Sequence, residues 1–579
     1  MEKECKMDVS LQDFNSSAEN YYLRGVLLIM KELKPQFFLS MKGYSGKQFA
    51  GDLTAGVIVA IIALPLSIAL ALASGVTPEQ GLYTAIIAGF IISFFGGSKV
   101  QIAGPTAAFA SIVAGIVARN GMDGLIIATV MAGILLVAMG LLRLGSMIKF
   151  IPFTITTGFT AGIAVTIVIG QIKDFLGLTF EKTPLETMEK LEQVIACIGT
   201  ANLQALGVGL IALAILIVWP KLNKKVPPSL IAVLVSAVLV KALALKVNTI
   251  GDLYTISSSF PAFHLPEVTY ETVKTVLPDA FTIAILAAIE SLLSCVVADG
   301  MIGSKHNSNM ELVAQGLGNI GSALFGGIPA TGAIARTAAN IKNGGSSPVA
   351  GMVHAVVLLL TLLLLMPYAA LIPMPAIAAI LFMVAYNMSG WRTFLEIAKT
   401  SPKSDVVVLV LTFSLTVVFD LVVAIAVGLI LASLLFLSRM ADVADVQEWT
   451  YLDEYEEGKD TRDLKPVPGH TMVFEITGPM FFAAADKILE VPFHEEKKVM
   501  ILRMRSVPAM DITALNSLRK LNRVCREKGI RLMLSHVNEQ PMKVMRKAGF
   551  CQEAGEDNFF GCIDEALAEA EKLAESCRR

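Results

Sequence analysis

The sequence has little charge for its length. Asp, Glu, Lys and Arg make up 17% of its 579 residues and hydrophobic residues 54%, whereas about a quarter of a typical soluble domain is charged. The mean hydropathy is +0.65. These values exclude a disordered chain, a coiled coil and an ordinary soluble enzyme, and they indicate a protein embedded in a lipid bilayer. The net charge of −2 gives no reason to expect a nucleic-acid partner.

Paired cysteines and nucleotide motifs are lacking as well. The seven cysteines are scattered, without CxxC spacing or a Cys/His cluster, so we expect neither a disulfide framework nor a zinc site. The sequence has no GxxxxGKS or GxxxxGKT motif, which argues against an ATP-driven pump, and we expect no enzyme activity. No cofactor is expected beyond a coupling ion.

Apolar runs dominate the first three quarters of the chain. We count fourteen of them, broken by Gly, Pro and short charged loops, and two are too short to cross a bilayer as ordinary helices, namely 104–118 and 331–341. The predicted organisation is a cytoplasmic N-terminal segment (1–48), a membrane domain (49–440), an acidic linker (441–468) and a small α/β domain (469–577). The fold class is therefore an α-helical polytopic membrane protein with a soluble α/β domain.

Lys and Arg gather in alternate loops. With the N-terminus in the cytoplasm and fourteen crossings, the short external loops contain Arg119 or no basic residue, and the cytoplasmic loops contain most of the others. Because basic residues favour the cytoplasmic side, we expect both termini in the cytoplasm. One such loop holds Lys305, His306 and Asn307, where we expect a histidine that is solvated or hydrogen-bonded locally.

The two halves of the membrane domain repeat one another. Phe95-Gly96-Gly97 precedes the cluster Ala103-Gly104-Pro105-Thr106, and Phe325-Gly326-Gly327, 230 residues later (326 − 96), precedes the cluster Pro329-Ala330-Thr331-Gly332. Seven segments per half is an odd number, so the second half must be inverted in the membrane. Short segments interrupted by Gly and Pro at matching positions of inverted repeats indicate a transporter's binding site near the bilayer midplane.

A broken helix favours an anion. Its first turn has backbone N–H groups without partners, and its dipole places about half a positive charge there. Pro105 suits such a first turn because it has no N–H to lose, and Thr106 and Thr331 add hydroxyl groups. We therefore predict that two half-helices face each other across an anion site.

The same residues resemble a known family. LPLSIALALASGV and GGSKVQIAGPTAAF in the first half, and IESLLSCVVADGMIGSKHNSN with GGIPATGAIARTAANIKNGG in the second, resemble SulP anion transporters, over nearly all of residues 45–575. That family includes sulfate permeases, bicarbonate and dicarboxylate transporters, prestin and pendrin. The resemblance, closest to bacterial members, implies a seven-plus-seven inverted repeat with core and gate domains, a homodimer in the bacterial cytoplasmic membrane, and a C-terminal STAS domain.

Glu290 is the carboxylate that we expect at membrane depth. It lies inside an apolar run, where a charge costs several kcal/mol unless it is paired or protonated. Ser294 follows one helical turn later, on the same face, and sodium-coupled family members bind Na+ with such a pair. We assign Glu290, Ser294 and Thr331 to the coupling ion, with a Na+ site at Glu290 and Ser294 or a proton on Glu290. The alternative is a Glu bonded to backbone at a helix break.

Arg336 lies about one turn inside the second half-helix. It either attracts the anion or pairs electrostatically with Glu290, and the two roles are compatible. By motif match, the resemblance places the substrate against residues of three segments: Leu66, Leu70, Thr106, Ala107, Phe109, Gly332, Ala333, Ala335 and Arg336. In other family members, the positions that match Ala333 and Ala335 often carry hydroxyl side chains. Because both are Ala here, we expect the anion to be bound by backbone N–H groups instead. Ordinary packing is the alternative for Phe109 and the two leucines.

The C-terminal domain alternates strand and helix patterns. MVFEITG, KKVMILRM and GIRLMLSHV are typical of strands, and ALNSLRKLNRVCREKG, PMKVMRKAGF and DEALAEAEKLAE of helices. The turn resembles that of STAS domains at Asp511 and Thr513, although Ile512 replaces the Ser that is phosphorylated in anti-sigma antagonists. We weigh regulation at Asp511 and Thr513 against a role in docking a cytoplasmic partner or in assembly.

The sequence therefore predicts a secondary active transporter of a small anion (sulfate, bicarbonate or a dicarboxylate), coupled to H+ or Na+ and moving like an elevator. One alternative is a nucleobase permease of the same fold. The other is a membrane-anchored signalling protein whose active part is the STAS domain.

Overall fold

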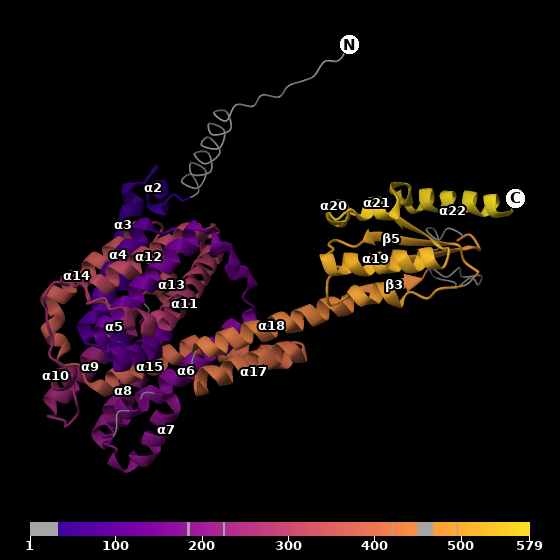
Figure 1. Ribbon diagram of the computed structural model, residues 1–579. Coiled ribbons are helices and arrows are strands. Elements are labelled where there is room, and N and C mark those ends of the chain that lie inside the picture. Colours follow the sequence, from indigo (N-terminus) through magenta and orange to yellow (C-terminus); the bar gives the residue numbers. More distant parts are fainter. Residues whose placement is uncertain are drawn as a thin grey trace. The chain divides into compact units, whose positions relative to one another are not determined.

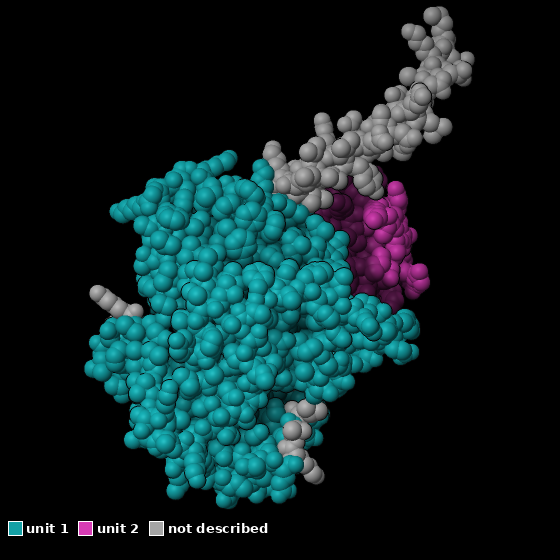
Figure 2. All heavy atoms as spheres, turned by 90° about the vertical axis from the view of Figure 1, so that its left-hand side faces the viewer, with its two compact units in different colours: residues 1–429 teal, residues 430–579 magenta. Residues whose placement is uncertain are grey.

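A computed structural model describes residues 33–181, 184, 186–223, 226–419, 421–448, 467–494 and 496–578. The predicted N-terminal segment up to residue 32 and the part of the predicted linker from 449 to 466 lie outside the described residues. The chain forms two compact units, residues 1–429 and 430–579, which Figure 2 colours teal and magenta.

The first unit is helical. Its main helices are α3 (Gly46–Ala73), α4 (Pro78–Phe95), α5 (Ala110–Leu141), α6 (Phe153–Leu176), α8 (Leu203–Leu222), α9 (Pro228–Ala242), α11 (Tyr270–Ile302), α12 (Ser308–Leu324), α13 (Ile334–Lys342), α14 (Val349–Ala369), α15 (Met374–Ser389), α17 (Lys403–Val418) and α18 (Leu421–Val443), the last continuing into the second unit. Gly121, with φ of 67°, interrupts α5 and divides it into two segments. Each of the fourteen predicted segments thus corresponds to a helical segment among the described residues. Short helices α2 (Gln36–Ser40), α7 (Thr187–Ala196), α10 (Ile250–Leu253) and α16 (Trp391–Thr400) complete the unit.

These helices pack in two groups. The first comprises α3, α4, α5, α11, α12, α13 and α14, and the second α6, α8, α9, α15 and α17. Figure 1 shows α3, α4, α12 and α14 gathered apart from α6, α8 and α15. Each group takes matching segments from both halves of the sequence, as an inverted repeat requires. The predicted division into core and gate domains is confirmed, with the first group as core and the second as gate.

A buried carboxylate fixes the start of α3. Asp52 is fully buried and accepts hydrogen bonds from the Tyr44 hydroxyl (2.6 Å) and from the backbone N–H groups of Ser346 (2.6 Å) and Ser347 (3.2 Å). These bonds join the first core helix to the loop between α13 and α14. Burial, followed by the hydrogen bond to Asp52, raises the pKa of Tyr44 to about 12.

The second unit contains a five-stranded sheet. Its strands lie in the order β3 (Asp445–Glu448), β4 (Thr471–Thr477), β5 (Val499–Ser506), β6 (Arg531–Ser535) and β7 (Phe559–Phe560), with β3 antiparallel and the others parallel. Strand residues alternate between two cores, one with α19 (Ile512–Glu527), α20 (Glu539–Lys547) and α21 (Phe550–Ala554), the other with α22 (Ile563–Arg578). In Figure 1, α19 and α22 accordingly lie on opposite sides of β5. The predicted α/β domain is confirmed.

One boundary needs correction. The sequence prediction assigned residues 441–468 to a linker, but β3 lies in this segment and pairs with β4. Four residues with alternating partial exposure give too weak a pattern to be identified as a strand. The domain is also fixed to the end of α18, because Nζ of Lys487 donates to the carbonyl groups of Ala441 (2.9 Å) and Ala444 (2.6 Å), which satisfies free carbonyls at a helix C-terminus.

Candidate functional site

The two broken segments meet. Strand β1 (Ala103–Gly104) pairs antiparallel with β2 (Thr331–Gly332), so that Ala103 faces Gly332 and Gly104 faces Thr331. A short 3-10 turn at Ala107–Phe109 leads from β1 into α5, and α13 begins just after β2. The first turns of both half-helices therefore start at one crossing.

Glycine is required on each side of this crossing. A Cβ on Gly332 would overlap the side-chain amide of Gln101, and a Cβ on Gly104 would overlap the guanidinium group of Arg336. These two side chains thus occupy the space that a Cβ would need. The glycines predicted as helix breakers also permit the close approach of the two halves.

Helix α11 holds both half-helices through one stretch of polar residues. Thr106 donates a 2.9 Å hydrogen bond to the half-buried carboxylate of Glu290. Thr331 shares a 2.6 Å bond with the hydroxyl of Ser291, and Ser294 donates to Thr337 of α13 at 3.4 Å. The first half-helix is therefore bonded to the carboxylate, and the second to two serines of the same helix.

Arg336 connects the second half-helix to the first. Its side chain is 1% exposed, and Nη2 donates to the Pro105 carbonyl and to the Ser67 hydroxyl of α3, both at 3.3 Å. Among the described residues it has no contact ion pair with Glu290, and the electrostatic pairing of these two stays a prediction. Its Nε and Nη1 have no hydrogen-bond partner there either. The positive charge of Arg336 is therefore not neutralised by a contacting carboxylate.

The remaining predicted site residues differ in how far they are exposed. Leu70, Ala107 and Phe109 are buried, Leu66 is half-buried, and Ala335 is exposed at the start of α13. The N–H of Ala333 donates to the Ile102 carbonyl at 2.9 Å. The expectation that this N–H is free for an anion is therefore wrong, because the pairing of the half-helices extends one residue beyond β2.

Several polar residues of the crossing were not predicted. Ser67 bonds to Arg336, Ser291 bonds to Thr331, and Thr337 accepts the N–H of Ile102 at 3.0 Å. All three are buried. A hydroxyl one residue after Glu290 was a signal within the sequence for Ser291. Ser67 and Thr337 carried no comparable signal, since their partners lie more than 200 residues away.

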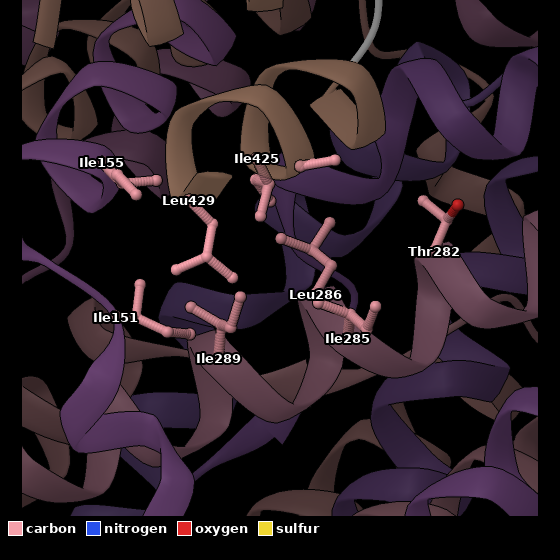
Figure 3. A pocket seen from close by; sticks show the side chains of 9 residues that line it. Ile151, Ile155, Thr282, Ile285, Leu286, Ile289, Ile425 and Leu429 are labelled. Atoms are coloured by element: carbon pink, nitrogen blue, oxygen red, sulfur yellow. The ribbon is translucent and has the colours of Figure 1, made fainter. Parts of the chain in front are cut away.

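A cavity of about 270 Å³ lies on a neighbouring face of α11. Figure 3 shows Ile285, Leu286 and Ile289 of α11 pointing into it, toward Ile425 and Leu429 of α18. The one hydroxyl of its lining, on Thr282, donates to the carbonyl of Pro278. The cavity contains none of the predicted site residues, and its apolar lining is unsuited to an anion.

In the C-terminal domain, Asp511 caps α19. Its two carboxylate oxygens accept the N–H of Ala514 (2.9 Å) and the N–H of Phe482 (2.8 Å). Ile512 and Thr513 are exposed at the same turn. The capping role explains the Asp by itself, and the regulatory role of Asp511 and Thr513 stays a prediction.

Comparison with known proteins agrees with this architecture. Residues 49–412 match the model of the sulfate permease family, and residues 463–566 match that of the STAS domain. The chain is 42% identical to a putative sulfate transporter, YvdB, of Bacillus subtilis over 90% of this chain and 98% of that protein. It is 31% identical to the bicarbonate transporter BicA of Synechocystis over 90% and 94% of the two chains.

Solved structures have the same fold. The structure of murine Slc26a9, an anion transporter captured in the inward-facing state, matches with a TM-score of 0.84 at 17% identity and covers 99% of this chain and 96% of that one. The transmembrane domain of a cyanobacterial BicA matches with a TM-score of 0.59 at 31% identity, over 67% of this chain and 98% of that one. The chain is a multi-pass membrane protein of the sulfate permease (SulP) family, with a C-terminal STAS domain.

Proposed function

We propose that this protein is a secondary active transporter of a small anion. The observation that carries the proposal is the crossing of the half-helices, where two helix N-termini and the unneutralised guanidinium of Arg336 lie together. Each of these contributes positive potential in a low-dielectric region, and at Arg336 no carboxylate contacts the charge among the described residues. The names of the relatives, a putative sulfate transporter and a bicarbonate transporter, favour sulfate and bicarbonate, with dicarboxylates as the third class.

We place the anion at the first turn of α13. The N–H groups of Ile334 and Ala335 precede the first bond within the helix, and Ala335 is exposed. Thr106, which faces the same crossing, is half-buried rather than buried. Backbone N–H groups bind an anion by charge and geometry with little discrimination, which suits a family whose members transport different anions.

Coupling is assigned to Glu290. A proton or a Na+ ion at this carboxylate would compete with the hydrogen bond from Thr106. Such an event would change both the charge at the crossing and the attachment of the first half-helix to α11. The Ser294 hydroxyl can bind the same ion if it gives up its hydrogen bond to Thr337. The Thr331 hydroxyl can do so if it gives up its hydrogen bond with Ser291.

Transport by an elevator-like movement fits the contacts between the two helix groups. Helix α11 of the core faces α6 and α18 through apolar residues that surround an incompletely packed cavity. Contacts between apolar side chains let two rigid bodies slide at low cost. Under this proposal the core moves with its anion against the gate, in a bacterial cytoplasmic membrane with both termini cytoplasmic. The homodimer and a cytoplasmic partner of the STAS domain belong to the same proposal.

The test is uptake into proteoliposomes of purified protein. Labelled sulfate, bicarbonate, succinate and uracil are compared, each under a Na+ gradient, a proton gradient and no gradient. We expect accumulation of at least one anion that requires a cation gradient. Uptake of uracil alone would favour a nucleobase permease, and correctly inserted protein that takes up none of the four would overturn the proposal.

A further inference from the structure

A second polar cavity, of about 570 Å³, lies away from the crossing. It is formed where α2, the loop after α5 and the start of α12 come together, and its lining includes Lys34, Leu39, Ser146, Lys305 and Ser308. In the predicted topology this is the cytoplasmic end of the membrane domain. Nothing in the proposed transport cycle uses these residues.

The cavity has an excess of positive charge. Lys34 and Lys305 are exposed side chains, and neither forms an ion pair within the part of the chain that the structure describes. Two carboxylates near the cavity, Asp299 and Glu311, already accept hydrogen bonds from other residues. Asp299 accepts from Nδ1 of His306 at 2.7 Å, and Glu311 accepts the N–H groups of Gly97 and Ser98 at 2.9 and 3.2 Å.

His306 and the start of α12 complete the lining. Ser308 shares a 2.9 Å hydrogen bond with Nε2 of His306, whose ring is thereby held between Ser308 and Asp299. Ser308 also opens α12, so the first turn of a 17-residue helix borders the cavity. Two ammonium groups and a helix N-terminus together suit the oxygens of a phosphate group.

Exposed apolar side chains at or near the lining residues Leu39 and Ser146 in the sequence form what we call the apolar flank of the cavity. Phe38 and Leu39 of α2 are 54% and 44% exposed, and Leu142 and Met147, on either side of Ser146 in sequence, are 71% and 52% exposed. Phe38 is stabilised in this position by an edge contact with Phe94 of α4, with ring centroids 5.8 Å apart. In a membrane protein, such exposed apolar groups are contacted by acyl chains.

From the juxtaposition of the two lysines with this apolar flank, we propose that the cavity binds the phosphate headgroup of an anionic phospholipid from the adjacent leaflet. The apolar flank decides between the two sources of a phosphate group, because a soluble phosphate would leave Phe38, Leu39, Leu142 and Met147 without a role. Basic pockets beside membrane helices on the cytoplasmic side commonly take such lipids.

The test uses the full chain in detergent micelles, titrated with phosphatidylglycerol or phosphatidylcholine and followed by native mass spectrometry. We expect wild type to bind phosphatidylglycerol at least tenfold more tightly than phosphatidylcholine. The double variant Lys34→Gln, Lys305→Gln should lose this preference. Its matched control is Lys342→Gln, Lys399→Gln, which removes two exposed lysines away from the cavity and should keep the preference.

Three results would overturn the proposal: equal binding of the two lipids, unchanged phosphatidylglycerol binding by the double variant, or displacement of the lipid by millimolar inorganic phosphate, which would identify a soluble ligand. Anion uptake is measured separately in vesicles of pure phosphatidylcholine. There the double variant should transport like wild type. Lipid binding and anion uptake are therefore measured independently, and the lipid proposal and the transport proposal can be refuted separately. Lys305→Gln alone provides a second variant should the double variant be unstable.

Discussion

Thr106 donates its hydroxyl to the carboxylate of Glu290 across 184 residues of sequence, at 2.9 Å. This bond joins the first half-helix to α11, which is bonded to the second half-helix through Ser291. Under the proposed function, an event that neutralises Glu290 therefore acts on the part of the site where we propose that the anion binds. That arrangement gives a physical basis for reciprocal coupling, in which each ion alters the affinity of the other by the same factor.

Glu290→Gln should abolish accumulation driven by a cation gradient. The amide of Gln is still able to accept the hydrogen bond of Thr106, but it neither gains nor loses a charge. We expect anion binding and downhill exchange to remain while uphill uptake falls to the level of empty liposomes. Glu271→Gln, an exposed position in the first turn of the same helix, is the control. Accumulation like that of wild type under both Na+ and proton gradients would show that Glu290 is structural.

Arg336→Ala should weaken anion binding by about tenfold or more, which corresponds to about 1.4 kcal/mol. It removes the charge at the crossing and leaves the carbonyl of Pro105 without its donor. The anion affinity of Arg336→Lys should lie between those of wild type and Arg336→Ala, because Lys keeps the charge and loses the planar donor geometry. Lys342→Ala, at the exposed end of the same helix, is the matched control. Binding is measured by isothermal calorimetry with the anion identified in the uptake panel, and equal affinity of the Ala variant and wild type would remove Arg336 from the site.

Adding one methyl group at the crossing should stop transport. Gly332→Ala places Cβ against Gln101, and Gly104→Ala places it against Arg336, at a cost of about 1–3 kcal/mol for overpacking. We expect a lower melting temperature and little uptake. Gly300→Ala is the control, because a Cβ there has no atom within 4 Å. Normal uptake by both crossing variants would mean that the two half-helices separate more easily than their pairing indicates.

The sequence alone predicts the crossing of the two half-helices but not the hydrogen bonds that hold it together. Gly and Pro break helices by local chemistry, so the broken segments and their inverted repeat are visible without a structure. The partners of Arg336 are not, because Ser67 and Pro105 become neighbours only when α3 and the two half-helices pack. Strand β3 was missed for the same reason, because its four residues are recognisable as a strand only through their pairing with β4.

Tyr44 gives the protein a pH-dependent contact outside the membrane spans. Its pKa rises from 10.0 to about 12 on folding, since burial and Asp52 disfavour the phenolate. The contribution to stability is therefore complete below pH 10 and is lost as the pH rises toward 12. Tyr44→Phe should lower the melting temperature at neutral pH and flatten its decline between pH 10 and 12. Parallel decline of variant and wild type over that range would refute this assignment, with Tyr270→Phe, an exposed tyrosine, as control.

Removal of the STAS domain should reduce transport without changing which anion is carried. The apolar spans end with α18 at Val443, and the predicted site lies entirely between Leu66 and Arg336, so a chain ending at Ala444 retains both. It loses β3 and the cap that Lys487 places on the end of α18, and we expect several-fold slower uptake from a membrane domain that still inserts. Lys487→Ala should reproduce part of this loss, whereas Lys498→Ala, an exposed lysine at the start of β5, should not. The relative uptake of sulfate, bicarbonate and succinate is the decisive measurement, because an altered order of preference would mean that the STAS domain contributes to the pathway of the anion.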